Sequence, residues 1–174
     1  MSDAVDAITR DHRALDALFE RVLADEGDRD ALLTEVADRL SAHSRAEELE
    51  VYPYLTDFEE NEREHFQAEH LLRRARNLTA SPHFAEAFRA FVAAVRHHVE
   101  EEESTVLPQL RELVDGGTLE RLGAAFETER ARLLDSPAEA RTRDELYARA
   151  RQVDLPGRSH MNKQELAEAL GEPT

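Results

Sequence analysis

A histidine and a glutamate stand four residues apart at two places in this chain, a spacing that could build a metal site. One copy lies in HVEEEESTVLP, which contains His98 and Glu102, and the other in HSRAEELEVYP, which contains His43 and Glu47. Residues four apart share one face of a helix. In both copies a proline follows ten residues after the histidine. The shared spacing of histidine, glutamate and proline indicates that the two segments are copies of one sequence motif.

A second repeat joins an acidic residue to a histidine. The segment DHRALDALF, which begins at Asp11, aligns with EHFQAEHLL, which begins at Glu64. The alignment matches His12 with His65, whereas His70 falls opposite an alanine. Each half of the chain therefore contributes one acid-His segment and one His-x-x-x-Glu segment.

Helices must position these segments, because apolar residues recur at three- and four-residue spacings over the first two thirds of the chain. We expect helices over about 3–25, 30–52, 62–78 and 83–114, separated by turns rich in glycine, proline and acidic residues. Helices joined by short turns run antiparallel to their neighbours. The sequence therefore predicts an all-α fold, an up-down-up-down four-helix bundle.

The bundle places four histidines at one depth. His12 lies fifteen residues before the turn at Gly27, and His43 lies sixteen after it. His65 and His98 stand at similar distances from the turn near residue 81. His70 would be about 8 Å off this level at the helical rise of about 1.5 Å per residue, and we expect it to face solvent.

Four imidazoles and two carboxylates gathered in a core need a common partner. Each unsatisfied buried polar group costs about 1–3 kcal/mol and an unpaired charge more, against a typical stability of about 5–15 kcal/mol. Metal ions would use all of these groups as ligands. With no cysteine, any metal must be held by nitrogen and oxygen, which suits iron, manganese or zinc. Six ligands fit two bridged metals better than one catalytic zinc. The candidate ligands are His12, His43, Glu47, His65, His98 and Glu102.

Residues 1 to about 115 resemble the hemerythrin-like, or HHE cation-binding, family. The matching features are the Asp-His at His12, the His-x-x-x-Glu-Glu with a following Tyr-Pro at His43, the Glu-His at His65 and the HVEEEE with a following Leu-Pro at His98. The resemblance implies a di-iron centre, with iron in preference to manganese or zinc. It also implies that the histidines are terminal ligands, that the two glutamates bridge, and that ferrous iron binds or reacts with dioxygen.

One position departs from the family pattern. True hemerythrins carry a second histidine four residues after that of the third helix, and here this residue is Glu69. Glu69, Asp16, His70 or water remains to complete the metal sphere. Glu48 and Glu103, next to the proposed bridging residues, are expected to be solvated or to lie behind the ligands. The missing histidine shifts the expectation from stable oxygen carriage toward sensing of oxygen or redox state, or peroxide and nitric-oxide chemistry.

Composition narrows the class of protein. The 174 residues are 41% hydrophobic and 34% charged, which suits a folded helical protein. The N-terminus has no signal-peptide pattern and no apolar run is long enough for a membrane span, so we expect a cytoplasmic location and no membrane partner. A net charge of −16, all of it within residues 1–140, argues against nucleic-acid binding by the bundle.

The remaining residues predict an outer helix and a small module. We expect residues 1–116 to form the bundle and 117–136 a connecting amphipathic helix, which lies on the bundle or pairs with another subunit in a homodimer. Residues 137–174 read as helix, extended loop and helix, and resemble the N-terminal domain of the Rho termination factor and SAP-like domains. Nucleic acid, through Arg158, His160 and Lys163, or a docked protein are the alternative partners of this module.

These expectations combine into three hypotheses for function. The first is a di-iron protein that binds or senses dioxygen or a related small oxidant, and it is favoured over an enzyme. The second is a di-iron enzyme that consumes peroxide or nitric oxide. The third is an iron-responsive interaction protein that acts through its C-terminal module.

Overall fold

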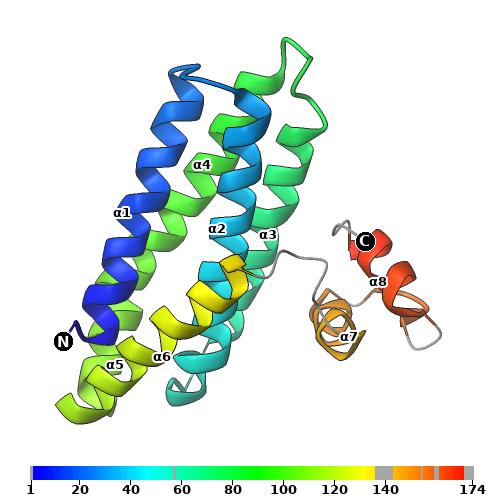
Figure 1. The fold of residues 1–174 in the computed structure, drawn as a ribbon. Coiled ribbons are helices and arrows are strands. Elements are labelled where there is room, and N and C mark those ends of the chain that lie inside the picture. Colours follow the sequence, from blue (N-terminus) through cyan, green and yellow to red (C-terminus); the bar gives the residue numbers. More distant parts are fainter. Residues whose placement is uncertain (1, 57, 136–142, 154, 159–160, 171–174) are drawn as a thin grey trace. The chain divides into compact units, whose positions relative to one another are not determined.

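The structure is a computed structural model that describes residues 2–56, 58–135, 143–153, 155–158 and 161–170. Its described residues are all-helical, as predicted. The core is a four-helix bundle of α1 (Ala4–Leu23), α2 (Arg29–Glu50), α3 (Glu59–Arg76) and α4 (Phe84–Glu101). These helices run alternately up and down (Figure 1).

Short polar turns set this antiparallel order. The Asp3 carboxylate accepts the Asp6 amide proton at the start of α1, and the Asp28 carboxylate accepts that of Ala31 at the start of α2. Between these helices the chain reverses through Asp25 and Gly27, whose φ angles are 55° and 86°. A left-handed backbone is easiest for glycine, so Gly27 suits this turn. The short 3₁₀ helix η1 (Tyr52–Tyr54), which contains the proline, turns the chain from α2 toward α3.

The expected helix over 83–114 is interrupted by a π turn, η2 (Glu102–Val106), before it continues as α5 (Leu107–Leu113). The amide of Leu107 donates to the carbonyl of Glu102, five residues earlier. Pro108 gives the physical reason, since it has no amide hydrogen and its ring crowds the carbonyl four residues before it. The π turn therefore falls at the glutamate that the sequence marks as a ligand.

Two apolar clusters fill the bundle, and a polar layer separates them. The upper cluster centres on Phe19, Phe88 and Phe91, and the lower cluster includes Ile8 and Tyr52. In sequence order, the buried histidines and glutamates of α1, α2 and α4 lie near the point where one cluster gives way to the other. The fold thus encloses charged groups between two hydrophobic layers.

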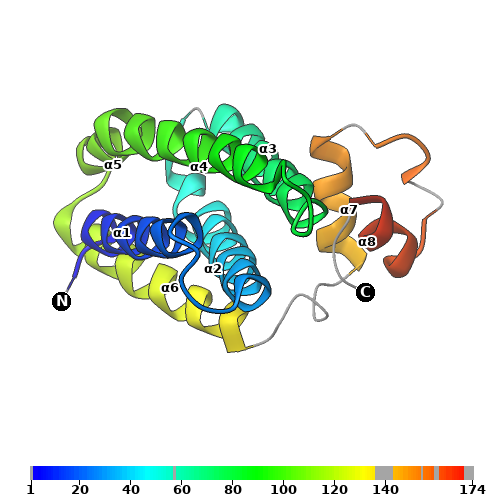
Figure 2. The ribbon, with the colours of Figure 1, turned by 90° about the horizontal axis from the view of Figure 1, so that it is seen from above.

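A further helix, α6 (Gly116–Asp135), crosses the outside of α1 and α2 (Figures 1 and 2). At Gly123 it comes so close to the start of α1 that an added Cβ would lie 2.7 Å from the carbonyl carbon of Asp3. Arg10 of α1 also forms an ion pair with Glu127 of α6. Glycine is required at this crossing, because any side chain would push the two backbones apart.

The chain divides into two compact units, Met1–Arg132 and Leu133–Thr174, so most of α6 belongs with the bundle. The second unit contains α7 (Arg143–Gln152) and α8 (Lys163–Leu170), which pack through Leu146, Leu166 and Leu170. Asn162 caps α8, with its side chain accepting from the Glu165 amide at 2.9 Å. His160, one of the suggested phosphate contacts, lies outside the described residues.

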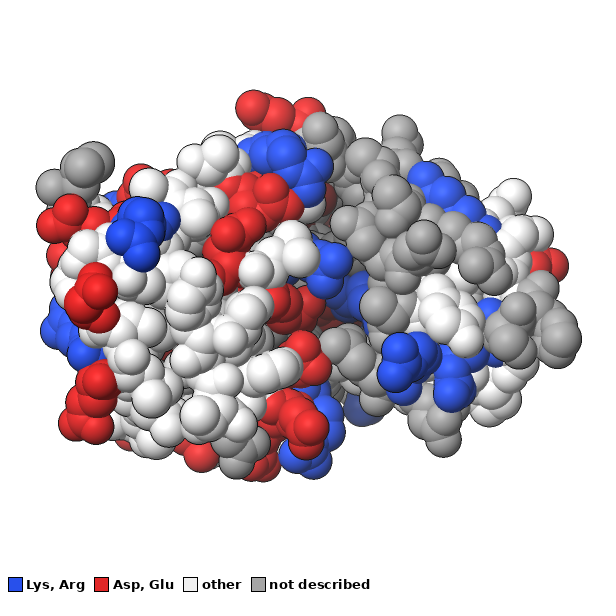
Figure 3. Space-filling model, turned by 90° about the horizontal axis from the view of Figure 1, so that it is seen from below, with Lys and Arg blue, Asp and Glu red and all other residues white. Residues whose placement is uncertain are grey.

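Acidic side chains are spread over the surface of the bundle when it is seen from below (Figure 3). Among the helices that the structure describes, none combines the length and the apolar character needed to cross a membrane.

Candidate metal centre

The six side chains singled out in the sequence lie together in the polar layer of the bundle. They form two groups, and within each group one ligand atom from every residue lies within 4.8 Å of those of the others. Glu47 belongs to both groups. The members of the first group are His12, His43, Glu47 and Glu102, and those of the second are Glu47, His65 and His98.

Each of the two glutamates lies between one histidine from each half of the chain. The Glu47 oxygens are 3.2 Å from His43 Nε2 and 3.4 Å from His65 Nε2. Glu102 Oε2 is 3.2 Å from His12 Nε2 and 3.8 Å from that of His98. Two donor atoms about 2.1 Å from a shared metal, at right angles, would be about 3 Å apart. The observed spacings therefore match those of ligands around common metal ions.

All four histidines are oriented from behind by a carboxylate. In each ring Nε2 faces the glutamates and Nδ1 contacts an acidic residue from another helix. The pairs are His12 with Glu103 at 2.9 Å, His43 with Asp11 at 2.9 Å, His65 with Glu48 at 3.4 Å and His98 with Glu64 at 2.8 Å. A carboxylate that accepts the Nδ1 proton leaves the Nε2 lone pair for a metal, which is the usual arrangement of metal-binding histidines.

The pairing follows an approximate two-fold relation between the halves. Asp11 and Glu64, the acids of the two acid-His segments, each bind the histidine of the next helix. Glu48 and Glu103 each bind a histidine of the opposite half. Sequence reasoning assigned no role to Asp11 and Glu64, although the repeated acid before each histidine was the available signal.

Arginines bind three of these four carboxylates. Arg130 of α6 reaches Asp11 at 2.5 and 2.7 Å, Arg13 reaches Glu103 at 2.6 Å, and Arg45 reaches Glu48 at 3.3 Å. Burial would raise the pKa of Asp11, but His43 and Arg130 outweigh this effect and hold the pKa below its ordinary value. Asp11 thus acts as an anionic acceptor.

Tyr52 is a site residue that the sequence did not single out. Its ring is fully buried and stacks on His65, with ring centres 5.7 Å apart and planes at 16°. Its hydroxyl lies 3.2 Å from His65 Nε2, on the side of the ring that faces the site. The only sequence signal was its place in the Tyr-Pro dipeptide after the His-x-x-x-Glu segment.

Buried oxygens without hydrogen bonds provide the test of whether a metal fits. Both carboxylate oxygens of Glu47 and of Glu102 are buried and have no partner with hydrogen-bond geometry. His12 Nε2 also lacks such a partner. The nearest imidazole nitrogens are within ion-pair distance of these oxygens but are not aligned for hydrogen bonds. Such groups are costly to bury, and a shared cation would satisfy all of them. The donor set therefore fits a metal site.

The charges of the site perturb one another strongly. Burial would lower the pKa of His12, but Glu102 and Glu47 outweigh it and raise the pKa to about 9. Glu47 likewise helps to overcome burial and to raise the pKa of His65 to about 10. Burial would raise the pKa of Glu102, yet the nearby histidines lower it to about 2. Burial and then the adjacent carboxylates raise the pKa of Tyr52 well above its ordinary value, so its hydroxyl stays protonated.

The other residues considered as ligands lie elsewhere. His70 is exposed, and Asp16 binds Arg96 at 2.7 Å on the surface. Glu69 is half-buried and belongs to none of the clusters that the described residues form. His97 lies in a separate, largely exposed group with Glu64 and Glu101.

Comparison with known proteins identifies the family of this chain. No curated protein and no solved structure was found to match it. The resemblance of residues 137–174 to the Rho and SAP-like modules therefore stays a prediction. Residues 3–110, which run from the start of α1 into α5 and include all six candidate ligands, match the model of the hemerythrin HHE cation-binding domain. The chain belongs to the hemerythrin HHE cation-binding family.

Proposed function

We propose that the bundle holds two iron ions and binds or senses dioxygen or a related small oxidant. The observation that carries this proposal is the shared position of Glu47 between two histidine groups, with buried carboxylate oxygens that lack hydrogen bonds. A site for one ion would not need a second group of histidines on the far side of the same carboxylate. The family supports cation binding, and the nitrogen and oxygen donors suit iron.

The residues have distinct roles in this proposal. His12 and His43 would hold one iron, His65 and His98 the other, and Glu47 and Glu102 would lie between the two ions. The chemistry that such a pair of ions supplies is the binding or the reduction of a small oxidant.

The surrounding residues prepare the site for this role. With metal bound, the carboxylates on Nδ1 would hold the one remaining proton of each imidazole on Nδ1, so that Nε2 is the nitrogen that binds the metal. The apolar clusters above and below exclude water. The Tyr52 hydroxyl, held against His65, offers either an oxygen ligand or a proton at the second iron position. It thereby takes the place for which Glu69, Asp16 and His70 were considered.

Tyr52 also supports a second candidate, an enzyme that consumes peroxide. Reduction of peroxide requires electrons, which ferrous iron at the proposed centre would supply, and protons at the oxygen atoms. The buried Tyr52 hydroxyl, 3.2 Å from His65 Nε2, is close enough to the proposed iron position to donate one of these protons.

The proposal can be tested by metal analysis of the purified 174-residue chain, followed by ferrous loading under nitrogen. We expect about two iron ions per chain, and a visible absorption change on exposure to oxygen that reverses under vacuum. Irreversible bleaching, with turnover of added peroxide, would instead favour the enzyme.

Adjacent histidines provide a matched pair of variants. His98→Ala should lower the iron content, whereas His97→Ala should not, because the His97 side chain is 71% exposed and pairs with Glu101, which is not a candidate ligand. Fewer than about one iron per chain in the unaltered protein, together with no effect of His98→Ala, would refute the metal centre.

A further inference from the structure

We propose that α6 completes the metal centre from outside the bundle, and that Arg130 is a positioning residue that acts through Asp11 on His43. The inference rests on the proposed function, since it takes His43 as a metal ligand. It goes beyond the family, because α6 follows the residues 3–110 that the family model covers.

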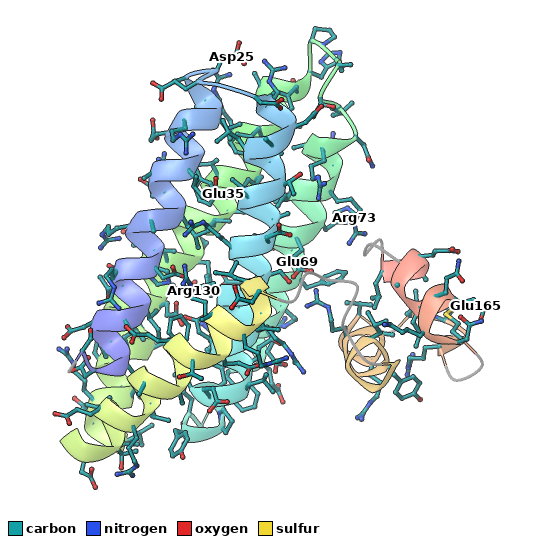
Figure 4. All side chains as sticks on the ribbon, viewed as in Figure 1. Asp25, Glu35, Glu69, Arg73, Arg130 and Glu165 are labelled. Carbon is teal, nitrogen blue, oxygen red and sulfur yellow. The ribbon has the colours of Figure 1, made fainter. Side chains whose placement is uncertain are left out.

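The contacts run in an unbroken line from α6 to the ligand. Arg130 Nη2 donates to Asp11 Oδ1 at 2.5 Å, and Arg130 Nε donates to Asp11 Oδ2 at 2.7 Å. The same Oδ2 lies 2.9 Å from His43 Nδ1. Figure 4 labels Arg130 where α6 crosses the bundle. The side chains are well shielded, with 7% of Asp11 and 20% of Arg130 exposed.

Two parallel hydrogen bonds from a guanidinium fix a carboxylate in its plane. Asp11 therefore has one orientation in which to receive the Nδ1 proton of His43. Since a carboxylate can only accept, the proton must sit on Nδ1, and the lone pair on Nε2 must face Glu47. The carboxylate thus sets the tautomer of the ring, and Arg130 fixes the orientation of that carboxylate.

A second contact from α6 covers the same imidazole. The ring of Phe126 meets that of His43 edge to face, with centres 5.7 Å apart and planes at 88°. Phe126 is almost fully buried. The ligand is therefore packed from behind by one α6 residue and held in orientation by another.

The α6 helix packs closely against α1, so a change in the position of α6 would move Arg130 and Phe126 relative to His43. At Gly123 its backbone lies directly against the start of α1, and the Arg10–Glu127 pair joins the same two helices. By contrast Arg13 and Arg45, which bind Glu103 and Glu48, belong to the bundle helices themselves. Among the described arginines bound to these carboxylates, Arg130 alone comes from outside the family domain.

The coupling must act in both directions. If the docked α6 improves the metal affinity of His43, metal bound at His43 must stabilise the docked α6 by the same free energy. Metal loading is therefore expected to protect the α6 backbone from local opening.

The test compares Arg130→Met with Arg121→Met, a matched loss of charge on the same helix. Arg121 donates to Thr118 within α6. Loss of a group behind a metal ligand typically lowers metal affinity about 10- to 100-fold, and we expect at least about 10-fold for Arg130→Met and no change for Arg121→Met. Affinity would be measured by competition with a chelator, using zinc as a redox-inert ion.

Two further readouts separate positioning from simple destabilisation. In the cobalt-loaded 174-residue chain, the Nδ1 proton of His43 should give a paramagnetically shifted signal that exchanges faster with solvent in Arg130→Met. Hydrogen exchange of the α6 amides should slow on metal loading in the unaltered protein, and less so in the variant.

Equal affinities for the two variants, or an α6 whose exchange ignores the metal, would overturn the inference while leaving the metal centre intact. An unaltered chain that binds no metal would overturn the proposed function as well. Unfolding of both variants in the metal-free state gives the stability change, so that a loss of affinity can be compared among folded proteins.

Discussion

Metal loading of this protein should release protons. In the metal-free site His12 has a pKa of about 9 and His65 a pKa of about 10, because the glutamates between them favour the charged imidazolium. A metal needs the Nε2 lone pair of each ring, so it must displace the proton that the ring carries. The carboxylates thus attract first protons and then metal ions.

The magnitude follows from these values. At pH 7 both rings are almost fully protonated, and loading both metal positions should release about two protons from His12 and His65 together. Two histidines with the ordinary pKa of about 6.5 would release only about half a proton in total at this pH. The difference is large enough to measure.

Titration calorimetry provides the assay. Zinc would be titrated into the metal-free chain at pH 7 in phosphate and in Tris, whose ionisation enthalpies differ, and the difference in heat gives the protons released. The release from these two rings should fall to about half a proton at pH 10 and vanish at about pH 11, where both rings are neutral. His12→Gln should lower the release at pH 7 by about one proton, whereas the exposed His97→Gln should not change it. A release of half a proton or less in the unaltered chain would show that the rings are neutral without metal, and that the ion-pair description is wrong.

The remaining predictions concern stability. Since folding raises the pKa of His12 and His65, these rings contribute fully to the free energy of unfolding below about pH 6.5, and the contribution is lost as the pH rises toward 9–10. Denaturant unfolding of the metal-free protein should therefore show stability that falls over this range, by up to about 1.4 kcal/mol per pH unit for each ring. A flat profile would contradict this. Glu102→Leu removes one partner of the buried pair that Glu102 forms with His12, so at pH 7 the metal-free variant should be less stable than the unaltered protein, and its thermal unfolding should no longer respond to added metal. Gly123→Ala should destabilise the chain by about 1–3 kcal/mol, because its methyl group would overlap the α1 backbone, and Gly116→Ala, which has open space around it, should not. Equal stability of the two alanine variants would show that the crossing of α6 is looser than described.

The sequence was sufficient for the helices and for the level at which their polar residues meet. Periodicity placed the four bundle helices, and distance from the turns selected His65 over the exposed His70. This worked because depth in an antiparallel bundle depends mainly on residue count and helical rise, which are local quantities.

Contacts between helices were harder to predict. That Asp11 binds His43, one helix away, depends on how α1 and α2 are rotated about their axes. The role of Tyr52 depends on η1, which turns its ring onto His65. The π turn at Glu102 was also not predicted, because the periodicity argument assumes a regular helix, although Pro108 in the sequence is its cause.

The outer helix shows the same limit. Its apolar pattern predicted a helix, but not the side of the bundle that it covers, since the contact made by Gly123 involves only backbone atoms of α1. A contact between backbones cannot be predicted from the pattern of hydrophobic side chains.

The position of α6 after the ligand helices also sets an order of events during synthesis. A chain grows from its N-terminus at about 5–20 residues per second, so Arg130 is added on the order of seconds after Glu102, the last of the six candidate ligands. During that interval all six candidate ligands have been added to the chain, but Phe126, which packs on His43, and Arg130, which binds Asp11, have not. The residues that complete the surroundings of His43 are therefore added to the chain only after every candidate ligand has been made.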